Sequence, residues 1–278
     1  MSEFEGGVAV VTGAGSGLGA AMAERFFAAG MSVVVLDIDG DRAERQAESL
    51  RRRGGAAIAR RVDVADRASL EAAARAVEDA FSGCTVLCAN VGVQQVGALE
   101  RLTEPEWRWV LDVNVLGVVG AVAAFLPLLR LRSGPRHILL TSSSSALLPF
   151  ESIGAYAASK FAVQGYGETL RLELAPEGIG VSILFPAGMS TRHVESSGLA
   201  RPIALGPAAP AAEDIEVLRA SPGLKAQSQI LTPEEATRNL LADLAANERY
   251  IVTHGGYRQE MAERWEDLLR AFDRAQTS

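Results

Sequence analysis

Residues 8–19 read VAVVTGAGSGLG, a short apolar run that leads directly into four glycines at alternate positions. The run Val8–Thr12 shows no polar alternation, as expected of a strand in a parallel sheet that is covered on both faces. The glycines allow a sharp turn and let a pyrophosphate approach the amides at the N-terminus of the following helix. A tight turn that binds no ligand is the alternative for this motif alone. A nucleoside-triphosphate P-loop is excluded, because no Gly-Lys-Ser/Thr follows.

The second apolar run, Val33–Asp37, ends in a carboxylate about 20 residues after the glycine turn, the offset at which an acidic residue meets the adenosine ribose. A carboxylate there accepts hydrogen bonds from the 2′ and 3′ hydroxyls and repels a 2′-phosphate, which favours NAD over NADP. The alternative is that Asp37 only caps the following helix. The neighbouring Asp39, Asp41 and Arg42 could weaken the preference.

Further along the chain, short β-branched runs alternate with longer segments rich in Ala, Leu, Arg and Glu. The runs predicted as strands are Val8–Thr12, Val33–Asp37, Ala57–Val62, Val86–Ala89, Ile138–Ser142, Val181–Phe185 and Tyr250–Thr253. The predicted helices are Gly17–Ala29, Asp41–Arg53, Ala68–Phe81, Glu104–Leu131, Ala155–Leu174 and Pro233–Ala246. This alternation predicts an α/β fold, a doubly wound sheet of about seven parallel strands with helices on both faces. No composition shift marks a linker, so residues 1–278 are predicted to form one domain that carries both the cofactor and the substrate site.

Two regions depart from this alternation. Residues 187–231 are long, irregular and rich in Pro, Ala and Ser, and loops of this length in a compact domain are usually functional or disordered. We expect a lid over the substrate with one or two short helices. From Tyr257 onward, the spacing of apolar residues predicts an amphipathic terminal helix.

The charge balance argues against one class of partner. The formal net charge is −7, with 27 Lys and Arg residues against 34 Asp and Glu residues. Sequence-independent nucleic-acid binding depends on basic patches, so no nucleic-acid partner is expected. The first five residues are acidic and are not followed by a secretory apolar segment. A cytoplasmic location is therefore predicted.

Cysteine and histidine usage gives no sign of a disulfide or a metal site. Cys84 and Cys88 would lie about 13 Å apart on one strand, at about 3.3 Å per residue. A disulfide needs Cα atoms within about 7 Å, so none is expected. His137, His193 and His254 lie far from one another and from the cysteines in the sequence, so no metal ligand set is predicted.

The stretch Val113–Leu131 is apolar enough to raise the question of a membrane. It contains Asn114, Pro127 and Arg130, however, and a helix that is apolar on most sides is more often buried between a sheet and a partner subunit. We therefore expect a buried helix and no membrane partner.

Several motifs, in order along the chain, resemble those of the short-chain dehydrogenase/reductase family. They are the TGxxxGxG turn from Thr12 to Gly19, Asp63-Val64, Ala89-Asn90-Val91-Gly92, Asn114, Ser143 with Tyr156 and Lys160, and Pro186-Ala187-Gly188 with Thr191. The resemblance spans residues 6–195. Ala89 and Ala187 replace an Asn and a Gly of the family pattern, and the strand near Tyr250 leads into a helix instead of the usual closing turn.

This resemblance implies a Rossmann-like fold, NAD as the cofactor and a set of site residues. The implied catalytic residues are Asn114, Ser143, Tyr156 and Lys160. The implied cofactor contacts are Gly13, Ser16, Gly17, Leu18, Gly19, Asp37, Ile38, Asp63, Val64, Asn90, Val91, Gly92, Tyr156, Lys160, Pro186, Ala187, Gly188, Met189 and Thr191. Lys160 is also implied to bind the nicotinamide ribose, and Asn114 to hold a water that relays protons through Lys160.

The chemistry of alcohol oxidation explains why a Tyr and a Lys at this spacing matter. A hydride leaves carbon for the cofactor while a proton leaves oxygen for a base. Tyr156 and Lys160 are spaced i, i+4 and so share a helix face, where an ammonium would lower the pKa of the phenol from about 10. Taken singly, the pair could be a solvated helix face, Asn114 a polar helix residue, and Ser143 one of four consecutive serines.

The sequence thus predicts an NAD-dependent oxidoreductase that interconverts a secondary alcohol and its ketone. The alternatives are a catalytically silent NAD-binding regulator and an enzyme of the same fold that performs epimerisation or dehydration. Residues expected to line the substrate pocket are Val93, Gln95, Ser143, Ser145, Leu147, Phe150, Met189 and His193. This mostly apolar set favours a hydrophobic substrate, cyclic or aromatic. Glu104–Leu131 and Ala155–Leu174 have more apolar surface than one sheet face can cover, and the resemblance implies that these helices pair across two-fold axes. We therefore expect a homotetramer, with a dimer as the alternative.

Overall fold

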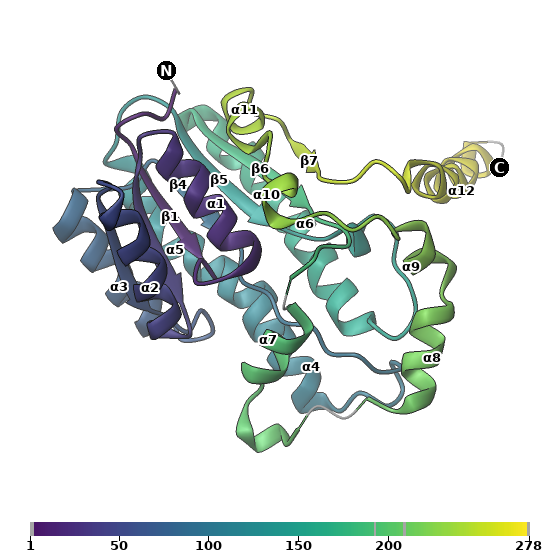
Figure 1. Ribbon diagram of the computed structural model, residues 1–278. Coiled ribbons are helices and arrows are strands. Elements are labelled where there is room, and N and C mark those ends of the chain that lie inside the picture. The colour runs from purple at the N-terminus through teal and green to yellow at the C-terminus, as the bar shows by residue number, and fades with distance from the viewer. Residues whose placement is uncertain (1–2, 192, 208–209, 277–278) are drawn as a thin grey trace.

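The computed structural model describes residues 3–191, 193–207 and 210–276, and these build one sheet of seven parallel strands (Figure 1). The spatial order is β3-β2-β1-β4-β5-β6-β7. The strands are β1 (Val8–Thr12), β2 (Ser32–Asp37), β3 (Ala57–Arg61), β4 (Val86–Ala89), β5 (Arg136–Thr141), β6 (Ile179–Phe185) and β7 (Tyr250–Val252). The order reverses between β1 and β4, where doubly wound sheets hold their ligands. The predicted Rossmann-like α/β fold is confirmed.

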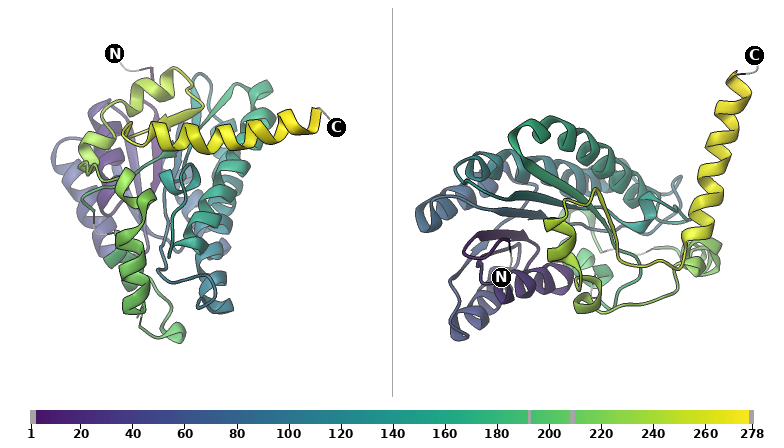
Figure 2. Two further views of the ribbon diagram at one scale, coloured as in Figure 1. Left: turned by 90° about the vertical axis from the view of Figure 1, so that its right-hand side faces the viewer. Right: turned by 90° about the horizontal axis from the view of Figure 1, so that it is seen from above.

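Helices cover both faces of this sheet (Figure 2). One face carries α1 (Gly17–Ala28), α2 (Gly40–Arg52), α10 (Pro233–Ala236) and α11 (Leu240–Ala245). The other carries α3 (Arg67–Phe81), α5 (Gly117–Arg130) and α6 (Gly154–Leu174), with α4 (Glu104–Leu111) packed against α6. Short 3₁₀ turns occupy Ser144–Ala146 and Ala175–Glu177. The helix predicted over Pro233–Ala246 is two helices, α10 and α11, in the structure.

The strands separate two apolar cores, which explains their lack of alternation. All five residues of β1 are buried. Val8 and Val10 belong to the core under α3 and α5, whereas Ala9 and Val11 belong to the core under α1. The apolar residues of a central strand therefore contribute to one core or the other in turn, so that neither face shows a polar alternation.

The segment predicted as a single helix, Glu104–Leu131, contains an irregularity. A π-helical turn over Asp112–Leu116 separates α4 from α5. Glu104–Arg130 as a whole is long and apolar enough, by length and composition only, to cross a membrane. It packs on α3 and β4, however, and Phe125 and Leu129 are fully buried there, as in a helix that covers the sheet of an α/β domain. Cys84 and Cys88 are buried and free, as expected.

The predicted lid region contains α7 (His193–Leu199), a 3₁₀ turn (Ile203–Leu205), α8 (Ala212–Ala220) and α9 (Pro222–Ala226), while residues 192, 208 and 209 lie outside the described residues. Two arginines tie it to the body. Arg101, before α4, pairs with the buried Asp214 of α8, and Arg201 pairs with Glu106 of α4 at 2.7 Å. These side-chain contacts fix the lid over the carboxyl ends of the central strands.

The terminal helix α12 (Arg258–Gln276) projects away from the body (Figure 2). It has no buried residue along its length. Near its start, Arg264 donates to the main-chain oxygen of Leu147 and lies over the ring of Phe161 on α6. The predicted amphipathic helix is present, and it is attached at one end only.

Candidate active site

The glycine turn between β1 and α1 has a geometry that side chains would obstruct. Gly13 and Gly17 have φ of 67° and 54°, in the left-handed region that favours glycine. A Cβ on Gly19 would lie 2.2 Å from the main-chain oxygen of Gly13. The turn and the start of α1 line a cavity of about 1450 Å³. Main-chain amides at a helix N-terminus suit a pyrophosphate, so this end of the cavity fits a dinucleotide.

Asp37 lies at the end of β2 beside this turn and also lines the cavity. Its Oδ2 accepts from the Gly15 amide at 2.9 Å, and its Oδ1 accepts from the Asp39 amide at 3.0 Å. The residue that caps α2 is Asp39, whose side chain accepts from the Arg42 amide. The alternative interpretation of Asp37 as a helix cap is therefore wrong. A carboxylate held in this way keeps lone pairs for ribose hydroxyls.

Two cations share the adenosine end with Asp37. Arg42 lines the cavity but is paired with Asp39 at 3.0 Å, and Arg61 lines it while donating to the main-chain oxygen of Ile38. The remaining lining here comes from Ile38, Asp63 and Val64. Asp37 thus has two positively charged neighbours, Arg42 and Arg61, and either could attract a 2′-phosphate.

Asn90 joins three strand ends under the middle of the cavity. Its side chain donates to the main-chain oxygen of Thr12 at 3.1 Å and accepts from the Thr141 hydroxyl at 3.2 Å. Its amide donates to the Thr12 hydroxyl at 2.9 Å. Val91 and Gly92 follow and line the cavity. The roles of Thr12 and Thr141 were missed by sequence reasoning, although both are polar residues at the ends of apolar strands.

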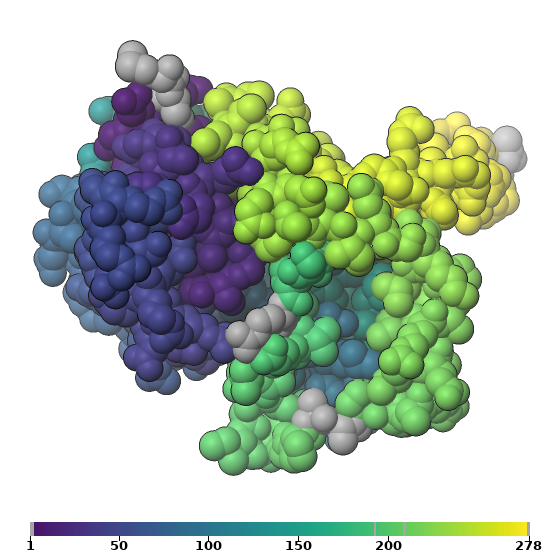
Figure 3. All heavy atoms as spheres, in the orientation of Figure 1, coloured from purple at the N-terminus to yellow at the C-terminus, as the bar shows by residue number. Residues whose placement is uncertain are grey.

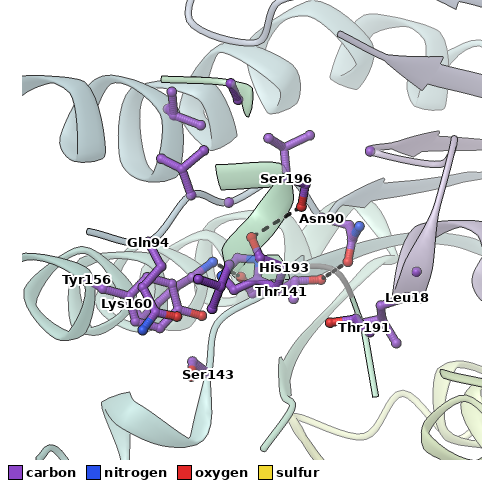
Figure 4. Close-up of a pocket in the computed structure, with 18 of the residues that line it drawn as sticks. Leu18, Asn90, Gln94, Thr141, Ser143, Tyr156, Lys160, Thr191, His193 and Ser196 are labelled. Carbon is purple, nitrogen blue, oxygen red and sulfur yellow. Dashed lines mark hydrogen bonds between the residues drawn. The ribbon is translucent and has the colours of Figure 1, made fainter. Parts of the chain in front are cut away.

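Tyr156 and Lys160 lie on successive turns at the start of α6 and both line the cavity (Figure 4). The Lys160 Nζ is 5.6 Å from the centroid of the Tyr156 ring and donates to the main-chain oxygen of Thr141 at 2.9 Å. Ser143, which follows β5, lies beside Tyr156 and accepts from the Ser145 amide. The structure therefore brings together the serine that follows β5 and the tyrosine and lysine at the start of α6.

The pKa values of these groups differ from the sequence-based expectation. Burial raises the pKa of the Tyr156 hydroxyl, and its hydrogen bond with Ser143 offsets part of that rise. Burial also lowers the pKa of Lys160 from 10.5 to about 8. The expected lowering of the tyrosine pKa by Lys160 is not found, because Nζ is directed to the Thr141 carbonyl and desolvation disfavours the charged form of both groups.

Asn114 lies in the π-helical turn and is fully buried. Its Oδ1 accepts from the Val93 amide at 2.7 Å, and its Nδ2 donates to the Val93 oxygen and to the Ser159 hydroxyl, both at 2.9 Å. Ser159 in turn donates to the main-chain oxygen of Tyr156. The side chain of Asn114 therefore positions the cavity wall and the tyrosine, and a water held at this residue would need its main-chain carbonyl.

The loop after β6 forms the opposite wall of the cavity. Its lining residues are Pro186, Ala187, Gly188, Met189 and Thr191. The Pro186 oxygen accepts from the Ser144 amide at 2.8 Å, and the Gly188 oxygen bonds with Nε2 of His254 at 2.9 Å. His254 is a positioning residue that sequence reasoning missed, because only the pairing of β6 with β7 brings it to this loop.

The substrate end of the cavity opens beneath the lid, and Figure 3 shows a hollow in the surface between α7 and α8. Val93, Ser143, Ser145, Phe150, Met189 and His193 line it, as expected. Gln95 and Leu147 do not. The Gln95 side chain is directed to the lid, where it accepts from Arg201 at 2.5 Å. The prediction that Gln95 lines the substrate pocket is therefore wrong, because its side chain is held by Arg201 of the lid.

The lid contributes lining residues that sequence spacing could not select. The apolar ones include Leu199, Leu205, Leu218, Leu224 and Ile230, with Ile153 and Trp109 from the body. Two exposed cations, Arg219 and Lys225, lie at the rim. The substrate end is thus mainly apolar, and the charged side chain buried in it is Lys160, beside Tyr156.

Comparisons with known proteins agree with this geometry. A family model described as "short chain dehydrogenase" matches residues 7–201. The chain is 37% identical over 205 residues to 1-deoxy-11-beta-hydroxypentalenate dehydrogenase of Streptomyces exfoliatus, covering 71% of this chain and 72% of that protein. It is 34% identical to 2,5-dichloro-2,5-cyclohexadiene-1,4-diol dehydrogenase of Sphingobium indicum, with 68% and 76% covered. A short chain dehydrogenase/reductase from Burkholderia phymatum, solved in complex with NAD, superposes with a TM-score of 0.88 at 35% identity, over 98% of this chain and 97% of that one.

Proposed function

The chain belongs to the short-chain dehydrogenase family, and from that premise we propose that it interconverts a secondary alcohol and its ketone by hydride transfer with NAD. The observation that carries this proposal is a single cavity. Its one end is the glycine turn with Asp37, and its other end holds Tyr156, Lys160 and Ser143. A bound dinucleotide would therefore extend from the first strand to the buried tyrosine.

In this proposal Tyr156 moves the proton at its hydroxyl oxygen. Ser143 hydrogen-bonds the same substrate oxygen and holds it against the phenol. A bound NAD supplies the hydride acceptor and a positive charge near the phenol. Lys160, buried on the next turn of the helix, is positioned to bind the nicotinamide ribose and to add to that positive field. Both charges favour the phenolate and would counter the rise in the tyrosine pKa that burial causes.

The preference for NAD rests on Asp37. Its carboxylate faces the cavity, while two main-chain amides fix its orientation. Ribose hydroxyls can donate to it, whereas a 2′-phosphate would be repelled. The presence of NAD in the solved relative from Burkholderia phymatum supports the same choice. NADP is the less favoured alternative, because Arg42 and Arg61 lie close by.

We further propose a hydrophobic substrate, cyclic or aromatic. The apolar lining from the lid and from Phe150 and Ile153 would desolvate a ring of this kind. The two curated relatives are named for cyclic hydroxylated compounds, in agreement with such a pocket.

We also propose that the chain forms a single domain, is located in the cytoplasm and assembles as a homotetramer, with a dimer as the alternative. Exposed leucines on the outer surfaces of α5 and α6 support assembly, namely Leu116, Leu131 and Leu172, which stand at the ends of α5 and on the last turn of α6. Light scattering that gave the mass of one chain at micromolar concentration would contradict the assembly.

The test of the function is a screen for NAD reduction at neutral to alkaline pH with a panel of cyclic and aromatic secondary alcohols, and of NADH oxidation with the matching ketones. We expect turnover with members of both panels. The opposing hypothesis is a silent NAD-binding regulator, and it predicts NAD binding by calorimetry with no turnover on any member.

A further inference from the structure

We propose that the ring nitrogen Nε2 of His193 binds a second oxygen of the substrate, so that the preferred substrate is an alcohol with another hydroxyl or carbonyl group on the same ring. This inference rests on the proposed function and specifies its substrate class. It assigns a specificity-determining role to a residue of the lid.

His193 is the first residue of α7 and lies against the catalytic tyrosine. The centroids of its ring and the Tyr156 ring are 5.8 Å apart, with the planes tilted by 56°. The side chain lines the cavity, and Figure 4 shows it among the other site residues, with its main-chain oxygen joined to Ser196. A group bound by His193 would therefore lie next to the carbon that Tyr156 helps to oxidise.

The three histidines of the chain provide an internal comparison. Nε2 of His137 bonds with the Ser182 hydroxyl at 2.8 Å. His254 uses both ring nitrogens, one toward Thr253 and one toward the Gly188 oxygen. Nε2 of His193, in contrast, is buried with no hydrogen-bond partner among the residues that the structure describes. Of the three histidines, His193 is the one that lines the cavity.

A buried polar atom without a partner is costly, by about 1–3 kcal/mol, so it usually has a function or a partner supplied by a ligand. The main chain of His193 is held in place by hydrogen bonds within α7. Its oxygen accepts from the hydroxyls of Ser196 and Ser197, at 3.2 and 2.7 Å. The turn is therefore fixed, and the ring is held beside the tyrosine although Nε2 has no hydrogen-bond partner among the described residues.

The charge state of His193 indicates which ligand group would fit. Burial, together with the nearby positive charge of Lys160, lowers the pKa of His193 to about 4, so the ring is neutral near pH 7. A neutral imidazole carries one donor and one acceptor nitrogen. An uncharged hydroxyl or carbonyl oxygen can pair with it, whereas a carboxylate would gain no charge–charge attraction from the neutral ring. Because the two rings are only 5.8 Å apart, both oxygens would belong to one small ring.

The experiment compares kcat/KM for cyclohexanol with that for cyclohexane-1,2-, 1,3- and 1,4-diol. We expect the best diol to exceed cyclohexanol by at least about tenfold. His193→Phe, which keeps an aromatic ring, should lower kcat/KM for that diol by roughly 5- to 150-fold, the range of one unsatisfied hydrogen bond. It should change the value for cyclohexanol by less than about threefold, and His193→Asn should restore part of the preference.

The matched control is Val194→Ala, which alters an apolar lining residue on the same helix. It should affect cyclohexanol and the diols alike. An equal loss on all substrates in His193→Phe would mean that the ring only shapes the lid, and an unchanged diol preference would overturn the inference as well.

A second measurement separates this inference from the proposed function. In a Tyr156→Phe background with NAD, diol binding is followed by NMR without turnover, and His193→Phe should weaken it by a similar factor. If no alcohol is oxidised by the wild type, the proposed function fails, yet this binding comparison still decides the role of His193. Equal diol affinity with and without the imidazole would refute that role.

Discussion

The cofactor end and the substrate end of the cavity are built in different ways. At the cofactor end, the glycine turn is formed by main-chain groups that lie close together in the sequence. Examples are the close approach of Gly13 and Gly19 and the hydrogen bond from the Gly15 amide to Asp37. At the substrate end, ion pairs join residues about one hundred positions apart, such as Arg101 with Asp214 and Arg201 with Glu106. A local motif can specify the first kind of site, whereas only the completed fold specifies the second.

Tyr156 stands where the two ends meet, and its removal should have the largest effect. Tyr156→Phe keeps the ring and removes the hydroxyl that moves the proton, so kcat should fall by about 10²–10⁴-fold or more. NAD affinity should change little, because the cofactor end is independent of the phenol. Steady-state kinetics and NAD titration measure both quantities. If the two ends were coupled, cofactor affinity would fall together with kcat.

The matched control for this substitution is Tyr166→Phe. Tyr166 lies on the same helix, is half-buried and does not line the cavity. The Tyr166→Phe enzyme should retain nearly all of the wild-type activity. A Tyr156→Phe enzyme with more than about a tenth of the wild-type kcat would show that another group carries the proton.

Asp37 tests the cofactor end alone. Asp37→Asn keeps side-chain acceptors for the Gly15 amide but removes the negative charge, so Arg42 and Arg61 should then attract a 2′-phosphate. The ratio of kcat/KM for NAD to that for NADP should fall by roughly 10- to 100-fold, the scale of a charged hydrogen bond. Asp41→Ala, an exposed change on α2, should leave the ratio unchanged. A wild type that prefers NADP would disprove the assignment.

Lys160 lies where the two ends of the cavity meet, and the burial of its charge lowers the free energy of unfolding. Its pKa in the folded protein, about 8, lies below the usual 10.5, so the folded state binds this proton less tightly than the unfolded chain. The penalty is fully present below pH 8 and disappears as pH rises toward 10.5. It amounts to about 3 kcal/mol, because each pKa unit corresponds to about 1.4 kcal/mol.

Lys160→Met should therefore abolish turnover yet raise the free energy of unfolding by about 1–3 kcal/mol at pH 7. The gain should shrink between pH 8 and 10.5, as urea denaturation at several pH values would show. Taking the difference between variant and wild type cancels the titration of the other buried groups. Lys225→Met, at the exposed rim, is the control and should change neither quantity. A loss of stability in Lys160→Met at pH 7 would contradict the buried-charge argument.

The difference between the two ends of the cavity also explains how much of the structure could be predicted from the sequence. The strands around the glycine turn were predicted almost to the residue, because every position of β1 is buried and no polar residue interrupts it. The convergence of Ser143, Tyr156 and Lys160 came from the resemblance to a family, not from periodicity. The cavity contains them together, but their catalytic roles stay predictions.

What the sequence could not predict depends on contacts that only the folded structure shows. The π-helical turn at Asn114 interrupts a continuous apolar helical pattern and has no residue signature of its own. Gln95 was expected in the pocket, yet its side chain accepts a hydrogen bond from Arg201 of the lid, more than one hundred residues away. The direction of the Tyr156 pKa was mistaken because i, i+4 spacing does not reveal that Lys160 bonds to Thr141.

The smallest effect should come from loosening the lid alone. Asp214→Asn removes the charge that Arg101 holds, and this carboxylate on α8 is the most buried of the three acidic side chains that meet Arg101. KM for a bulky alcohol should rise by roughly two- to fivefold, in the range of a partly exposed ion pair, while KM for NAD and kcat stay nearly constant. Limited proteolysis should cut residues 210–231 faster. The control is Glu213→Gln, since Glu213 is exposed and meets the same Arg101 at 3.6 Å, and it should do less. If Asp214→Asn instead raised KM for NAD as much as for the alcohol, the lid would be part of the cofactor site, and the separation of the two ends would be wrong.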